Sequence, residues 1–164
     1  MGKPQPTSAG AKLLTAGVVL YLVAWFVPVF QGQNLFGGAA EWTRPLGASA
    51  LSAPDWLPGW GACCAAWDLL VGDPPREADA ARVRTLGATC LTNAVMLVAF
   101  VVLAAGRQRL LVGALLLGCA ALDASWLYLN DREFVEALRP GYYLWLVSFA
   151  LTGLGALLQP PRAR

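Results

Sequence analysis

The sequence contains no histidine and little charge, and these two absences exclude most enzyme chemistry. Histidine is the commonest metal ligand and the usual general base at neutral pH, so this chain alone cannot assemble a Ser–His or Cys–His nucleophile. The four cysteines form no C-x-x-C pair, the spacing typical of redox and zinc sites. A net charge of +2 gives no basis for binding nucleic acid. We therefore predict a protein that is not an enzyme, with no catalytic residue, no metal site and no cofactor.

Charged residues make up only 13% of the 164 residues, whereas apolar residues make up 57%. Such a chain cannot cover a globular surface with polar groups, so lipid must be its solvent for much of its length. A membrane span needs about 20 mainly apolar residues to cross a hydrocarbon core of about 30 Å. Four stretches meet this condition, at about residues 13–30, 85–105, 110–129 and 142–158. We expect the first to remain as a span rather than to be removed as a signal peptide.

A fifth apolar stretch, residues 60–71, is too short to span and contains Asp68. It is typical of an interfacial or re-entrant helix. The sequence therefore predicts an all-α fold, a four-helix transmembrane bundle with this short interfacial helix in a long first outer loop over residues 31–84. The whole chain, residues 1–164, is expected to form one transmembrane domain.

The distribution of charge predicts the orientation of the bundle. With four spans, Lys and Arg divide equally between the two sides, but nine of the ten carboxylates fall on one side only. The short hairpin Gly106-Arg107-Gln108-Arg109 is basic and is of the kind retained in the cytoplasm. We expect a multi-pass protein of the bacterial inner membrane with both termini in the cytoplasm.

Tryptophan and tyrosine support the same orientation, because all seven tryptophans fall on the outer side of this topology. Both side chains favour the headgroup region, where the ring is buried and one edge forms a hydrogen bond. An anchored rim is the simpler interpretation, and a docking face for a lipid or a partner is the alternative. The expected outer aromatic face comprises Trp25, Trp56, Trp60, Trp67, Trp126, Trp145, Tyr142 and Tyr143.

Small and polar residues recur at helical spacing in the predicted spans and indicate where helices pack. In lipid, close approach of helices depends on small residues and on interhelical hydrogen bonds. The third span offers a row of small residues, and the fourth offers a second row. We expect both to be seams of the bundle: Ala114, Gly118, Ala121 and Ser125 in one, and Ser148, Thr152, Gly155 and Gln159 in the other.

Asp123 is the one acidic residue placed within a span. An aspartate near the bilayer centre costs about 2.5–3.5 kcal/mol on the insertion scale. It lies at nearly the same depth as Asn93 in the neighbouring span. We expect a structural role, in which a protonated Asp123 faces the bundle interior and forms an interhelical hydrogen bond with Asn93 or Thr89. A proton or cation relay is the alternative, although relays normally show several ionisable groups in line.

The cysteines allow two interpretations. Cys63 and Cys64 are adjacent, and Cys90 lies near the same end of its predicted span, so that Cys63 or Cys64 could pair with it. The simpler interpretation is that they are small apolar packing residues.

Three segments carry a resemblance to known proteins. The first span contains Tyr21-Leu22 followed by Trp25-Phe26-Val27-Pro28, the loop contains Leu57-Pro58-Gly59-Trp60, and the last span opens with Gly141-Tyr142-Tyr143-Leu144-Trp145. In this order the chain resembles small bacterial four-span membrane proteins that have no assigned activity. The resemblance implies the four-span layout and no catalytic residue.

The sequence favours a non-catalytic accessory or structural subunit of a larger membrane complex. Its expected partners are membrane lipid and other membrane subunits or copies of itself, and no nucleic acid. One alternative is a small transporter or channel component that uses Asp123 and oligomerises. Another is a lipid- or toxin-binding protein of the immunity type, and a thiol oxidoreductase is the weakest.

Overall fold

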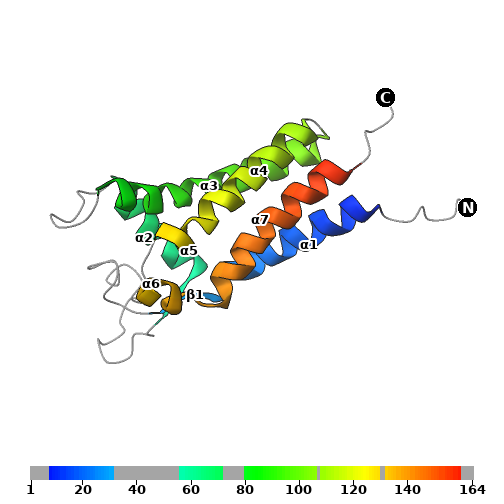
Figure 1. Ribbon diagram of the computed structural model, residues 1–164. Coiled ribbons are helices and arrows are strands. Elements are labelled where there is room, and N and C mark those ends of the chain that lie inside the picture. Colours follow the sequence, from blue (N-terminus) through cyan, green and yellow to red (C-terminus); the bar gives the residue numbers. More distant parts are fainter. Residues whose placement is uncertain (1–7, 32–55, 72–79, 107, 130–131, 160–164) are drawn as a thin grey trace, which may run out of the picture.

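The computed structural model describes residues 8–31, 56–71, 80–106, 108–129 and 132–159, and it is mostly helical (Figure 1). Most of the loop expected over residues 31–84 therefore lies outside the described residues. The elements in chain order are α1 (Ala9–Ala24), β1 (Pro28–Gln31), β2 (Trp56–Pro58), α2 (Gly59–Val71), α3 (Ala80–Ala104), α4 (Arg109–Ala124), α5 (Trp126–Leu129), α6 (Arg132–Ala137) and α7 (Pro140–Leu158).

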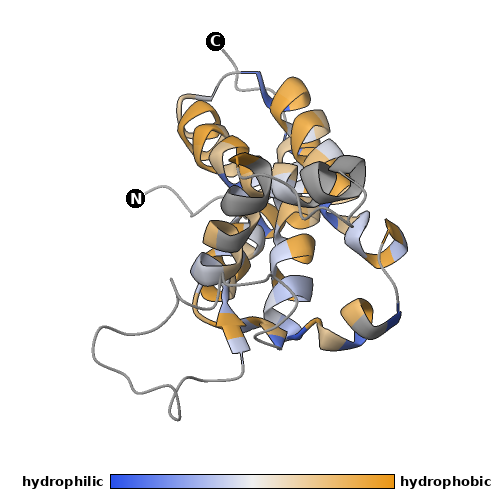
Figure 2. Cartoon of the chain, turned by 90° about the vertical axis from the view of Figure 1, so that its left-hand side faces the viewer, coloured by the Kyte–Doolittle hydropathy of each residue, from blue (hydrophilic) through white to orange (hydrophobic). Residues whose placement is uncertain are grey.

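Three helical segments are long and apolar enough to cross a membrane: Gly87–Ala104 within α3, Arg109–Leu129 over α4 and α5, and Pro140–Leu158, which is α7. These correspond to the second, third and fourth expected spans. Many large apolar side chains on them are exposed, among them Val101 (70%) and Leu110 (72%). Figure 2 shows hydrophobic residues along all the long helices of the bundle. Such a surface is suited to lipid rather than to water.

The first apolar stretch differs from its expected bounds. Ser8 caps α1, because its hydroxyl oxygen accepts a hydrogen bond from the Ala11 amide (3.2 Å), so the helix begins at Ala9. The helix ends at Ala24, and Pro28 opens a strand instead of lying inside a helix. The resulting helix of 16 residues is about 24 Å long, shorter than a hydrocarbon core of about 30 Å.

A small two-stranded sheet was not expected from the sequence. β1 pairs antiparallel with β2, with Pro28 opposite Pro58 and an irregularity at Val29. The Arg139 amide donates a hydrogen bond to the Val29 carbonyl oxygen (2.9 Å), which ties the start of α7 to this sheet. A short helix is present at the expected residues as α2, which follows β2 directly and packs along α3, and its interfacial position stays a prediction.

α7 lies between α1 and α4, and α3 packs against both α4 and α2. The expected seam on α7 is confirmed, because Ser148, Thr152 and Gly155 are buried against α1. A Cβ atom at Gly17 would lie 2.7 Å from the Thr152 amide nitrogen, and one at Gly155 would lie 2.5 Å from the Leu14 amide nitrogen. Glycine on both helices therefore lets the two backbones approach closely.

The expected seam on α4 is wrong. Ala114, Gly118 and Ala121 are exposed, and Ser125 is half-buried. A Cβ atom at Gly118 would meet no atom of the described residues within 4 Å. α4 instead turns inward a face that includes Val112, Gly113, Leu116, Cys119, Ala120 and Asp123. In a membrane helix both faces are apolar, so hydrophobicity does not distinguish the inward face from the lipid-facing one.

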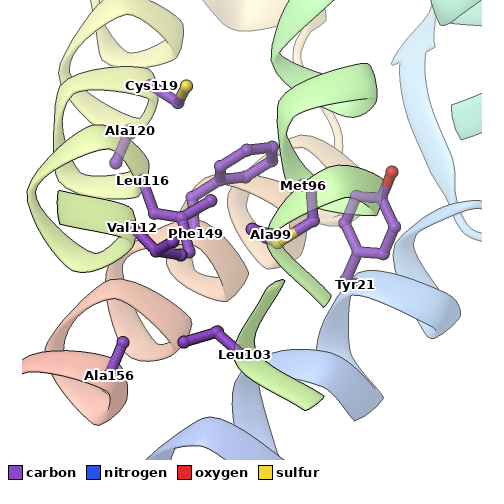
Figure 3. Packing of buried hydrophobic residues seen from close by; sticks show 10 residues of the cluster. All are labelled: Tyr21, Met96, Ala99, Leu103, Val112, Leu116, Cys119, Ala120, Phe149 and Ala156. Atoms are coloured by element: carbon purple, nitrogen blue, oxygen red, sulfur yellow. The ribbon is translucent and has the colours of Figure 1, made fainter. Parts of the chain in front are cut away.

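The core between the four long helices is built from large apolar side chains. Figure 3 shows Tyr21 of α1, Met96 of α3, Leu116 of α4 and Phe149 of α7 converging, and all four are almost fully buried. The ring of Tyr21 packs edge-on against Phe149 and also against Phe100, with centroids 6.0 and 5.6 Å apart. This packing positions the hydroxyl group of Tyr21, which forms a hydrogen bond with Asn93.

Candidate functional site

The side-chain amide of Asn93 connects four helices. Asn93 projects from α3 and is only 7% exposed. Its Oδ1 atom accepts hydrogen bonds from the hydroxyl group of Tyr21 on α1 (3.0 Å) and from the indole Nε1 of Trp145 on α7 (3.1 Å). Its Nδ2 atom donates to the sulfur of Cys63 on α2, at 3.5 Å. One uncharged amide therefore holds α1, α2, α3 and α7 in register.

Asp123 is fully buried on α4, but it is not part of that network. Among the described residues, neither of its carboxyl oxygens has a hydrogen-bond partner. The expected hydrogen bond to Asn93 or Thr89 is thus not formed. Thr92 lies close to the carboxyl group, but its hydroxyl group donates to the Thr89 carbonyl oxygen (2.6 Å). The Asp123 backbone carbonyl accepts from the Tyr142 hydroxyl group (2.8 Å), which fixes the end of α4 against α7.

All four cysteines are free. Cys63 and Cys90 line one small cavity, so α2 and α3 bring together two of the residues that the sequence suggested as a pair. Burial raises the pKa of the Cys63 thiol, and the neighbouring Cys90 raises it further. A raised pKa keeps the thiol protonated at neutral pH, and the protonated thiol is a poor nucleophile. The local environment therefore favours a packing role over thiol exchange.

The aromatic residues expected on one outer face fall into two groups. Trp56, Trp60, Trp67 and Tyr143 are exposed. Trp126 and Tyr142 are buried and stack with their rings 5.8 Å apart, and Trp145 packs edge-on against both. Trp25, at the end of α1, is half-buried. The interior group belongs to the core at this end of the bundle, which also contains Phe30 and Phe134.

Two hollows lie beside Asn93. The first is the small cavity lined by Cys63 and Cys90, of about 20 Å³, which has room for about one water molecule. The second is an open groove of about 570 Å³ between α2 and α3, whose lining includes Trp25, Trp67, Leu91 and Leu97. Trp25, Cys63, Cys90 and Asn93 line both, so the groove adjoins the cavity.

Sequence reasoning missed Tyr21 and Trp145 as partners of Asn93. Both are amphipathic residues inside apolar helices, and a buried Tyr or Trp usually finds a hydrogen-bond partner. That rule signals that each needs an acceptor, but only the packing of α1 and α7 against α3 shows that both use the same oxygen atom.

The buried polar groups around Asn93 are neutral donors and acceptors. Asp123 adds a buried carboxyl group outside this network. Within the described residues, no three His, Cys, Asp or Glu side chains gather closely enough to hold a metal ion. The arrangement is suited to binding and to holding helices together. Comparisons with protein-family models, with curated proteins and with solved structures find no match for this chain.

Proposed function

We propose that this protein is a non-catalytic accessory subunit of a larger membrane complex, and that α4 is the helix that contacts its partner. The observation that carries the proposal is the outward row of small residues on α4, namely Ala114, Gly118 and Ala121. The spacing of four and three residues places them on one side of the helix.

Small residues in a row allow another helix to approach closely, and this is how helices associate in lipid. The equivalent row on α7 is filled by α1, where Gly10 and Gly17 supply the close approach. Among the described residues, the row on α4 has no such neighbour at Gly118. The small residues on α7 are covered by α1 of the same chain, whereas those on α4 are exposed. We therefore assign the row on α4 to contact with a transmembrane helix of another polypeptide.

A pull-down with Gly118→Phe tests this assignment. The Gly118 position is open, so we expect the variant to fold as the wild type does. We expect a C-terminally tagged wild-type copy, extracted in gentle detergent, to bring down a partner in stoichiometric amount. Gly118→Phe should reduce that yield about tenfold, because the ring holds the helices apart. The measurement is quantitative mass spectrometry of the co-purified chains.

Val19→Phe is the matched control, since Val19 is 52% exposed on α1, which packs on α7 rather than on α4. Val19→Phe adds the same aromatic ring on an exposed face, but away from the row of small residues on α4. It should leave the yield of the partner unchanged. If both variants retain the partner equally, α4 is not the helix that contacts it. If the wild type purifies alone or only with itself, the accessory function is wrong.

The proposed topology is a four-span bundle in a bacterial inner membrane, with both termini in the cytoplasm and α2 at the interface. The packing of α1 against α7 supports α1 as the first span. α1 packs along α7 from Gly10, which lies against Gln159, to Gly17, which lies against Ser148 and Thr152. A helix held so closely beside a spanning helix shares its depth, although α1 alone is short.

A second function, a small transporter or channel component, is favoured by one observation. Asp123 is fully buried and has no partner for its carboxyl oxygens among the described residues. An ionisable side chain inside a membrane protein commonly marks an ion or proton path.

Replacing Asp123 with Asn distinguishes the two functions. Because no hydrogen bond of the carboxyl group is lost, we expect Asp123→Asn to fold with an unchanged melting temperature and to retain the partner. The measurements are thermal melting in detergent and the same pull-down. A homo-oligomer whose ion flux in liposomes disappears with Asp123→Asn would instead establish the transporter function.

A further inference from the structure

The groove between α2 and α3 has the composition of a site for an apolar ligand. Its volume of about 570 Å³ falls within the range of ligand pockets, about 300–1,000 Å³. The described residues that line it are all uncharged. Leu91 and Leu97 line it from α3 and are about half exposed, and both lie in the apolar segment Gly87–Ala104. The groove therefore opens toward the lipid that surrounds this segment.

Asn93 supplies a polar end to this apolar groove. Its side chain is more than nine-tenths buried and lines the groove. The amide nitrogen carries two hydrogens, but among the described residues it has one partner, the sulfur of Cys63 at 3.5 Å. Sulfur is a weak acceptor, so the nitrogen retains the capacity to donate a stronger hydrogen bond to a ligand. Because the Asn93 oxygen is occupied by Tyr21 and Trp145, the matching ligand atom is an acceptor, such as a carbonyl oxygen.

The depth of Asn93 selects among lipids that carry a carbonyl group. In the proposed topology it lies inside the hydrocarbon core, because it belongs to the apolar segment Gly87–Ala104, six residues or about 9 Å along the helix from Gly87. The ester carbonyls of phospholipids belong to the interface, outside the hydrocarbon core. A carbonyl that reaches Asn93 must therefore belong to a neutral lipid whose polar group enters the hydrocarbon region.

Two indole rings favour a flat ligand. Trp25 and Trp67 both line the groove, and Trp67 is exposed. Aromatic rings stack favourably on other flat rings. We propose that the groove binds a lipid-soluble quinone, whose ring carbonyl accepts a hydrogen bond from Asn93 and whose tail runs along Leu91 and Leu97 into the bilayer. The site is separate from the outward row of α4, so it does not depend on the accessory function.

The test uses an azido-benzoquinone with a decyl tail as a photoprobe, on the full chain in lipid nanodiscs. We expect saturable labelling of peptides from α2 and α3, and displacement of the probe by decylubiquinone. Ala94 is exposed and lines the groove, so Ala94→Trp should fill it and weaken the apparent affinity about tenfold or more. Leu97→Trp, on the same wall, is a second variant that should act in the same way.

Leu154→Trp is the control, because Leu154 is 42% exposed on α7 and does not line the groove. It should label as the wild type does. A parallel arm uses a phosphatidylethanolamine with a diazirine on its acyl chain. If this lipid labels the same peptides and decylubiquinone does not displace it, the groove holds an acyl chain and the quinone assignment is wrong. Labelling that is unsaturable, or that persists in both Ala94→Trp and Leu97→Trp, also overturns it.

Discussion

Gly17→Ala is expected to destabilise the protein by about 3 kcal/mol, at the upper end of the cost of overpacking. The added methyl group would fall on the Thr152 side chain, 2.7 Å from the Thr152 amide nitrogen and 2.9 Å from the Ser148 carbonyl oxygen. Backbone atoms of a helix cannot rotate away, so α1 and α7 must separate. Separation would weaken the contacts of the whole α1–α7 seam at once. The measurement is the free energy of unfolding in mixed detergent micelles.

The same substitution at Gly118 provides the control. Both glycines lie inside helices, so Gly118→Ala has the same effect on helix propensity, up to about 1 kcal/mol in favour of alanine in water. Only the surroundings differ, since a Cβ atom at Gly118 meets nothing within 4 Å. Gly118→Ala should be neutral or slightly stabilising for the isolated chain. Equal unfolding free energies for the two variants would show that the α1–α7 packing is not as close as described.

An apolar sequence indicates which segments form long helices, but it does not always indicate which face of a helix points inward. Length and hydropathy identify the three helical segments that are long and apolar enough to cross a membrane, because crossing a hydrocarbon core requires long apolar helices whatever their neighbours. The polar row on α7 also indicates its inward face. On α4 the same reasoning selects the wrong face, because small residues pack equally well against this chain or another. The strands β1 and β2 were missed because their pairing joins segments far apart in the sequence.

Part of the candidate site was visible in the sequence and part depended on packing. Asn93 and Asp123 stand out as polar residues in apolar helices, and both are buried. Their similar depth suggested a contact, but depth along a helix does not determine the direction in which a side chain points. Asn93 turns toward α1, α2 and α7, whereas the carboxyl oxygens of Asp123 have no hydrogen-bond partner within the part of the chain that the structure describes. The angular position of each helix is set by the close packing of all of them.

Asn93→Leu is expected to destabilise the protein by about 3 kcal/mol. The substitution preserves the size of the side chain but leaves the Tyr21 hydroxyl group and the Trp145 indole nitrogen without their acceptor. Each buried donor without a partner costs about 1–3 kcal/mol, although interhelical hydrogen bonds in membranes average only about 0.6 kcal/mol when both partners can readjust. The two donors share one acceptor, so both are orphaned together. The measurement is again the free energy of unfolding.

Tyr21→Phe provides the decisive comparison, because it removes one hydroxyl group and keeps the ring that packs against Phe100 and Phe149. In the wild-type background it should cost about 0.6 kcal/mol, since Asn93 still accepts from Trp145. In the Asn93→Leu background the same change should stabilise the protein, because it removes an orphaned donor. A reversal of sign identifies the amide as the acceptor that holds α1 to α3. Equal effects of Tyr21→Phe in both backgrounds would mean that the two side chains act independently and that another contact joins these helices.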